Sequence, residues 1–99
     1  MIRHIVMFTL SSTDQEQRTR DTEQMRARLG ALVGAVAGLH SLTLEPDLGL
    51  VEGHWDLVLT SEHDDNAALE AYQVHPAHVE AAAFIRTVIV ERAIVDYEV

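Results

Sequence analysis

Four segments of the chain are rich in β-branched and aromatic residues and partly alternate between apolar and polar positions. They run from Ile2 to Leu10, from Leu39 to Leu48, from His54 to His63 and from Arg92 to Glu98. This composition and the two-residue period are typical of strands in a sheet that is buried on at least one side. A turn at residues 49–53, which begins and ends with glycine, separates the second segment from the third.

Two other regions have apolar residues at helical spacing. In the first, from Gln15 to about Ala37, the apolar residues fall on one face: Met25, Leu29, Leu32, Val33 and Val36. The second follows the capping residues 64–66 and extends to about Val90. It must be interrupted at Pro76, because proline has no N–H to donate and its ring clashes with the preceding turn.

The predicted order is β-α-β-β-α-β, which is the order of ferredoxin-like folds. We therefore expect an α+β protein in which a four-stranded antiparallel sheet carries its helices on one face. No linker, repeat or low-complexity stretch divides the sequence, so residues 1–99 are expected to form one domain.

The first strand is apolar on both faces. Val6, Phe8 and Leu10 point one way, whereas Ile5 and Met7 point the other way. One helical layer covers only one face, so the other face needs a second sheet, which a homodimer would supply. We expect Val6, Phe8 or their neighbours on the helix-free face, together with the fourth strand, to lie in that interface.

Composition narrows the possible partners and locations. The net charge is −9, which disfavours binding to nucleic acid or to an anionic membrane, and all seven basic residues are arginine. No cysteine is present, so disulfides, thiol nucleophiles and thiolate metal sites are excluded. An apolar strand begins directly after Met1, without a leader typical of a signal peptide, and no apolar run reaches the roughly 20 residues of a membrane span. We expect a cytoplasmic protein.

The segment from Ala71 to His78 contains the strongest chemical signal. It places a phenol, Tyr72, and two imidazoles, His75 and His78, around Pro76. Proline suits a first helical turn, so His78 should lie near a helix N-terminus, where the dipole favours a neutral imidazole. A neutral His78 beside Tyr72 would form an acid–base pair. The alternative is a simple helix break, with His75 as the cap and Tyr72 in the core.

Other polar residues in the predicted strands are candidate site residues. His4 shares a face with Phe8, and Asp56 lies within an apolar strand where an unpaired carboxylate is costly. We expect Tyr72, His78, His4 and Asp56 to meet in one cavity under the helices, with His75 and Phe8 beside them. Asp56 bonded instead to backbone or to an arginine would be structural. The remaining polar histidines flank strands and are expected to be solvated: His40, His54 and His63.

No metal or cofactor is expected. His75 and His78 are three residues apart and could share a helical face, with Asp56 or His4 as a third ligand, but Pro76 disturbs that face. No phosphate-binding loop or dinucleotide fingerprint is present.

The chain resembles the stress-responsive A/B barrel (Dabb) domain family over nearly its whole length. The similarity rests on Ile2–Phe8, Gly38–Leu42, Trp55–Leu59, Ala68–His78 and Ile94–Glu98. Its most specific element is Tyr-x-x-His-Pro-x-His. The resemblance implies a dimeric α+β barrel, in agreement with the two-faced strand.

The family includes plant proteins linked to stress responses and a few aromatic polyketide cyclases. In those cyclases the tyrosine and the second histidine of the motif are the acid–base pair of an aldol condensation, which by position implies Tyr72 and His78. A histidine at the start of the first strand is matched by His4. Asp56 stands where the cyclases carry a third-strand histidine, and this departure counts against the cyclase activity.

Two functions compete at this point. The first is an enzyme that moves protons next to a carbonyl of a small, mostly apolar ligand. The second is a non-catalytic dimeric module for stress response or protein interaction. An open cavity of roughly 300 Å³ or more beside Tyr72 favours the first, and a collapsed interior favours the second.

Overall fold

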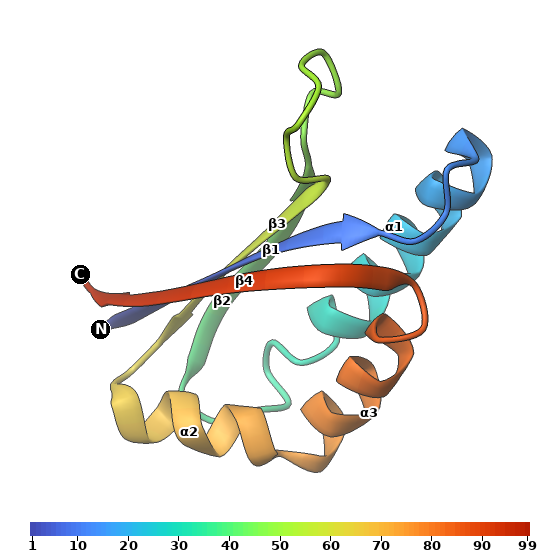
Figure 1. The fold of residues 1–99 in the computed structure, drawn as a ribbon. Helices are drawn as coiled ribbons and strands as arrows, with labels where there is room; N and C mark the ends of the chain where they lie inside the picture. The colour runs from blue at the N-terminus through green and yellow to red at the C-terminus, as the bar shows by residue number, and fades with distance from the viewer.

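The computed structural model describes all 99 residues, and its elements follow in the order β-α-β-β-α-α-β (Figure 1). The elements are β1 (Ile2–Leu10), α1 (Gln15–Gly30), β2 (Leu39–Pro46), β3 (Leu57–His63), α2 (Asn66–Val74), α3 (Pro76–Ile85) and β4 (Ile89–Glu98). The strands form one antiparallel sheet in the order β2-β3-β1-β4, with all helices on one face (Figure 1). The predicted ferredoxin-like arrangement is confirmed.

The first helix is shorter than predicted. It begins after Asp14, whose carboxylate accepts a hydrogen bond from the backbone N–H of Gln17 at 2.9 Å. It ends at Gly30 rather than near Ala37, and the chain continues in turns to Gly34, which has a φ of 86°. Such a φ is open to glycine at little cost and is incompatible with a right-handed helix. The apolar side chains beyond Gly30 nevertheless stay buried: Leu32 and Val36.

The second helical region is interrupted where predicted. His75 ends α2 by donating its N–H to the carbonyl of Tyr72 at 3.2 Å, and its ring Nδ1 accepts the N–H of Ala77 at 3.1 Å. Pro76 is the first residue of α3, where its missing N–H costs nothing. His75 therefore caps both helices, and it sets the angle between them.

Several predicted boundaries differ from the structure. The α3 helix ends at Ile85 rather than near Val90, and β4 begins at Ile89 rather than Arg92, because β-branched residues at positions 87–90 favour a strand. The third strand begins at Leu57 rather than His54, since the preceding turn extends past Gly53, which has a φ of 89°.

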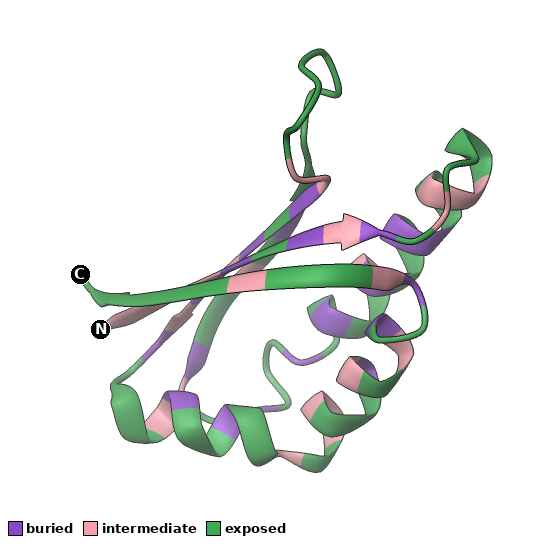
Figure 2. Ribbon diagram, in the orientation of Figure 1, coloured by how far each residue is buried: buried purple, intermediate pink, exposed green.

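The core lies between the helix-covered face of the sheet and the helices (Figure 2). Val6 and Phe8 belong to this core, with exposed fractions of 5% and 4%. The expectation that they lie in a dimer interface is therefore wrong, because the helices of their own chain already cover them. His4 shares this buried face, as the two-residue period requires.

The opposite face of the sheet carries exposed apolar side chains. Met7 lies opposite Val58 on one side and Ala93 on the other, and Ile5 lies opposite Val95. Met7 and Val58 are each 36% exposed, Val95 is 61% exposed, and nearly all of β4 is exposed (Figure 2). None of the three helices combines the length and apolar character that crossing a bilayer requires.

Candidate functional site

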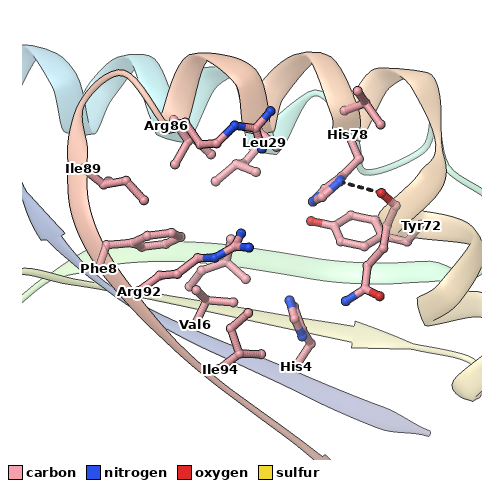
Figure 3. A pocket seen from close by; sticks show the side chains of 15 residues that line it. His4, Val6, Phe8, Leu29, Tyr72, His78, Arg86, Ile89, Arg92 and Ile94 are labelled. Carbon is pink, nitrogen blue, oxygen red and sulfur yellow. Dashed lines mark hydrogen bonds between the residues drawn. The ribbon is translucent and has the colours of Figure 1, made fainter.

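A pocket of about 400 Å³ opens between the sheet and α3 (Figure 3). Ten of its fifteen lining residues are hydrophobic. The lining residues are His4, Val6, Phe8, Leu29, Leu59, Tyr72, Gln73, His78, Val79, Ala82, Ile85, Arg86, Ile89, Arg92 and Ile94. The pocket is above the threshold of roughly 300 Å³ for a small-ligand site, so the interior is not collapsed.

Tyr72 lies in the last turn of α2 and is only 1% exposed. Its burial raises the pKa of Tyr72 to about 12, so the hydroxyl keeps its proton at neutral pH. That hydroxyl points into the pocket and makes no hydrogen bond within the chain (Figure 3). Tyr72 therefore presents a free proton donor to any molecule in the pocket.

His78 faces Tyr72 from the first turn of α3, with 4.4 Å between the two ring centroids. Its Nδ1 lies 3.2 Å from the carbonyl oxygen of Gln73. A carbonyl only accepts, so Nδ1 carries the proton and Nε2 keeps its lone pair. Burial is the main cause that lowers the pKa of His78, and the positive charges of nearby arginines add to it. The expected neutral form thus has a basis besides the helix dipole.

His4 reaches the same pocket from β1 and is held by an acidic partner. Its Nδ1 is 2.5 Å from Oδ1 of Asp96, the residue directly opposite on β4. The His4 side chain is 7% exposed and that of Asp96 is 39% exposed. The carboxylate accepts from Nδ1, so it fixes the ring orientation and directs the lone pair of a neutral His4 to Nε2. The centroids of His4 and Tyr72 are 6.4 Å apart.

His63 completes a cluster of four rings, although the sequence analysis expected it to be solvated. It is 0% exposed, with its ring centroid 4.7 Å from that of Tyr72. Its Nε2 is bonded to Ser61 Oγ at 2.9 Å, while Nδ1 has no partner. Burial lowers the pKa of His63. The alternation of β3 from Leu57 through Leu59 extends to His63, and this signal could have placed it inside.

Asp56 does not join the pocket, contrary to expectation. It forms an ion pair with Arg18 of α1, and its Oδ2 accepts the N–H of Leu10 at 2.8 Å. It lines a second hollow, of about 340 Å³, between α1 and the loop before β3. The shorter β3 begins after Asp56, which leaves this residue at the far end of the sheet from Tyr72. The structural alternative considered for Asp56 is the one observed.

The remaining candidates divide between the pocket and the surface. Phe8 lines the pocket, whereas His75 is used as a helix cap and does not. His40 and His54 are exposed and bonded to Asp64 and Asp47. No three side chains of the types that bind metals are grouped closely enough to hold an ion.

Sequence reasoning missed two arginines of the pocket. Arg86 ends α3, and Arg92 extends from β4 into the pocket (Figure 3). Neither forms an ion pair with an acidic residue of the chain. Arg92 lies opposite Phe8, and this pairing becomes visible only when the register of β1 and β4 is known.

The fold and the pocket define a small α+β protein with a ferredoxin-like sheet and a tyrosine–histidine site. The sequence profile described as "Stress responsive A/B Barrel Domain" matches residues 2–99, and the chain belongs to that family. The resemblance inferred from the sequence is confirmed. Among curated proteins, none matches this chain.

Many solved structures share the fold, and three of them illustrate the similarity. A dimeric protein of unknown function from Bacteroides fragilis is 26% identical, with a TM-score of 0.89 over 99% of this chain and 95% of that chain. A dimeric ferredoxin-like protein of unknown function from Thermobifida fusca is 31% identical, with a TM-score of 0.84 over 99% and 90%. A hydroxynitrile lyase from Passiflora edulis is 18% identical, with a TM-score of 0.81 over 97% and 90%, which shows a common fold only.

Proposed function

We propose that the pocket binds a small, mostly apolar carbonyl compound and that Tyr72 and His78 move a proton at the carbon beside its carbonyl. One observation carries this proposal: an unbonded hydroxyl and the free Nε2 of a neutral imidazole share one open pocket. The two groups have the protonation states that a general acid and a general base require.

The chemistry follows from these states. His78 Nε2 takes a proton from the α-carbon, and the electron pair of the broken C–H bond forms the enolate. The Tyr72 hydroxyl donates to the carbonyl oxygen, where negative charge develops. Return of the proton to carbon restores the ketone. Alternatively, the enolate carbon attacks a second carbonyl in the same molecule and closes a ring; the C=O π pair moves to oxygen, and the resulting alkoxide takes the proton from His78. The second outcome would be the cyclase-like reaction that the family resemblance implies.

We further propose that the functional unit is a homodimer. Two similar structures, from Bacteroides fragilis and Thermobifida fusca, are described as dimeric. The exposed apolar residues of the helix-free face, including Met7, Val58 and Val95, supply a surface for a second copy.

Hydrogen–deuterium exchange tests the proton transfer directly. The protein is incubated with acetophenone in D2O, and loss of the methyl signal is followed by NMR. We expect protein-dependent exchange, and Tyr72→Phe or His78→Ala should each reduce it at least about 100-fold, as for loss of a general acid or base. The melting temperature should change little in Tyr72→Phe, because the hydroxyl that is removed has no hydrogen bond within the chain. His78→Ala also loses the bond to the carbonyl of Gln73, so a modest decrease in melting temperature is expected there.

Matched controls separate chemistry from folding. Tyr97→Phe removes a hydroxyl that is on the opposite face, and His54→Ala removes an exposed imidazole. Both should exchange at the wild-type rate. If the wild type gives no exchange, or if the Tyr72 and His78 variants only lower the melting temperature, the enzyme proposal fails. The non-catalytic module would then be the better description.

A further inference from the structure

The pocket wall carries two arginines, Arg86 and Arg92, and no acidic residue, and the neighbouring carboxylate of Asp96 is bonded to His4. The whole chain has 16 acidic and 7 basic residues, with a net charge of −9, so acidic residues predominate in the chain as a whole. A pocket that excludes them while holding two guanidinium groups is complementary to an anion.

Comparison with the other five arginines shows that this arrangement is unusual within the chain. Arg3 lies 3.4 Å from Glu62, Arg20 lies 3.9 Å from Glu16 and Arg26 lies 2.8 Å from Glu23. Arg18 is paired with Asp56, and Arg28 lies 4.2 Å from the centroid of the Phe84 ring. Arg86 and Arg92 are thus the two arginines without an acidic or aromatic partner, and both line the pocket.

A bulge in β4 helps to place Arg92. Phe8 lies opposite Arg92, and Leu10 lies opposite Ile89. A step of two residues along β1 therefore corresponds to a step of three residues along β4. The extra residue resets the alternation, and Ile89 and Arg92 both reach the pocket. Figure 3 shows Ile89 and Phe8 at one end of the pocket and His78, Tyr72 and His4 at the other, with the side chains of Arg86 and Arg92 extending between them.

We propose that the ligand is a carboxylic acid with an apolar body, held by Arg92 and Arg86 at its carboxylate. Guanidinium groups match the planar, bidentate geometry of a carboxylate. The ten hydrophobic residues of the lining suit an aromatic or aliphatic body. The inference rests on the proposed function for the neighbouring part of the pocket, where the ligand's carbonyl meets Tyr72 and His78.

A pair of probes isolates the carboxylate. 4-Oxo-4-phenylbutanoate carries an aryl ketone and a carboxylate, and its primary amide has nearly the same shape without the charge. Calorimetric titration of the wild type should show the acid binding about tenfold more tightly than the amide, as expected for charge-assisted hydrogen bonds that are partly exposed to water. Arg92→Gln should remove most of this preference without weakening binding of the amide.

Arg20→Gln is the matched control, since it makes the same charge change on α1 outside the pocket. It should keep the acid preference. The carboxylate assignment would be overturned if the wild type bound acid and amide equally well. It would also be overturned if Arg92→Gln and Arg20→Gln lost the preference for the acid to the same extent. Tighter binding of phenylphosphonate than of the acid would assign the site to phosphorus oxyanions instead.

The outcomes also distinguish this inference from the proposed function. Acetophenone is neutral, so its exchange does not depend on Arg92 binding an anion. Exchange without a preference for the acid would support the acid–base pair and contradict the carboxylate assignment. A preference for the acid without exchange would support a binding site for carboxylic acids and contradict the proposed catalysis. Binding of neither probe would overturn the inference by itself.

Discussion

The two hollows on the helix side of the sheet are similar in size, but their arginines differ: those of one hollow have partners within the chain, and those of the other have no acidic partner. The one near α1, of about 340 Å³, contains Arg18 paired with Asp56. It also contains Arg26, which donates to the carbonyl of Leu44 at 3.0 Å. The one under α3, of about 400 Å³, contains Arg86 and Arg92 without acidic partners.

This difference separates structural charge from available charge. In the α1 hollow each charged group already has a partner, and Arg18 and Arg26 use theirs to tie α1 to the sheet side, so a ligand would have to displace these bonds. In the α3 pocket the arginines, the Tyr72 hydroxyl and His78 Nε2 keep their bonding capacity for a molecule from outside. Size alone would not have distinguished the two, whereas the satisfaction of polar groups does.

Asp56→Ala should produce the largest loss of stability among single changes that test this contrast. The change leaves the Leu10 N–H and the Arg18 guanidinium without their partner. We expect the free energy of unfolding to fall by about 2 kcal/mol, measured by urea denaturation. Glu23→Ala, on an exposed pair with Arg26, should cost less than about 0.5 kcal/mol. A cost for Asp56→Ala as small as that of the control would contradict a structural role.

Acid should weaken the fold through His63. Burial lowers the pKa of this histidine in the folded protein, so the unfolded chain binds the proton more readily. At high pH the His63 imidazole is neutral in both states and does not affect stability. Below about pH 6.5, the ordinary pKa of histidine, it destabilises the fold, and the free energy of unfolding falls by up to about 1.4 kcal/mol per pH unit for this one group. The nearby His4 also lowers the pKa of His63, whereas the carboxylate of Asp96 raises it.

Urea denaturation at several pH values measures this effect. In His63→Gln part of the pH dependence below about 6.5 should disappear. His54→Gln removes an imidazole that is 52% exposed and should leave the dependence as it is. The same dependence in His63→Gln and in the wild type would show that the buried imidazole is not the group responsible.

Arg92→Gln and Arg86→Gln should have the smallest effect on stability. Neither side chain has an acidic partner, so we expect a change within about 0.5 kcal/mol. Urea denaturation of both variants measures it. A loss well above that value would reveal an internal partner and remove the contrast between the two hollows.

Features set by local sequence were the easiest to predict. The interruption at Pro76 follows from the chemistry of one residue, and the strand from Ile2 to Leu10 follows from its own composition. The end of α1 was misplaced because apolar spacing continues through Leu32 and Val36 although the backbone leaves the helix at Gly30. Leu32 and Val36 are apolar because they are buried in the core, and not because they belong to the helix.

The site shows the same division. Tyr72 and His78 lie within seven residues and were found from their spacing. Asp96 was missed as the partner of His4 because 92 positions separate them, and only the pairing of β1 with β4 brings them together. Asp56 was placed wrongly because its strand was extended too far toward the N-terminus. Register between distant strands was the information that the sequence did not provide.

The cap that His75 shares between α2 and α3 has a consequence for divergence within the family. One short junction joins the helices that carry Tyr72 and His78, while most of the remaining pocket wall comes from β1, α1, β3, α3 and β4. Substitutions in the wall can therefore change which molecule fits without altering the spacing of the reactive pair. Under the proposed function, the junction sets the spacing of the acid–base pair and the rest of the wall sets which molecule fits.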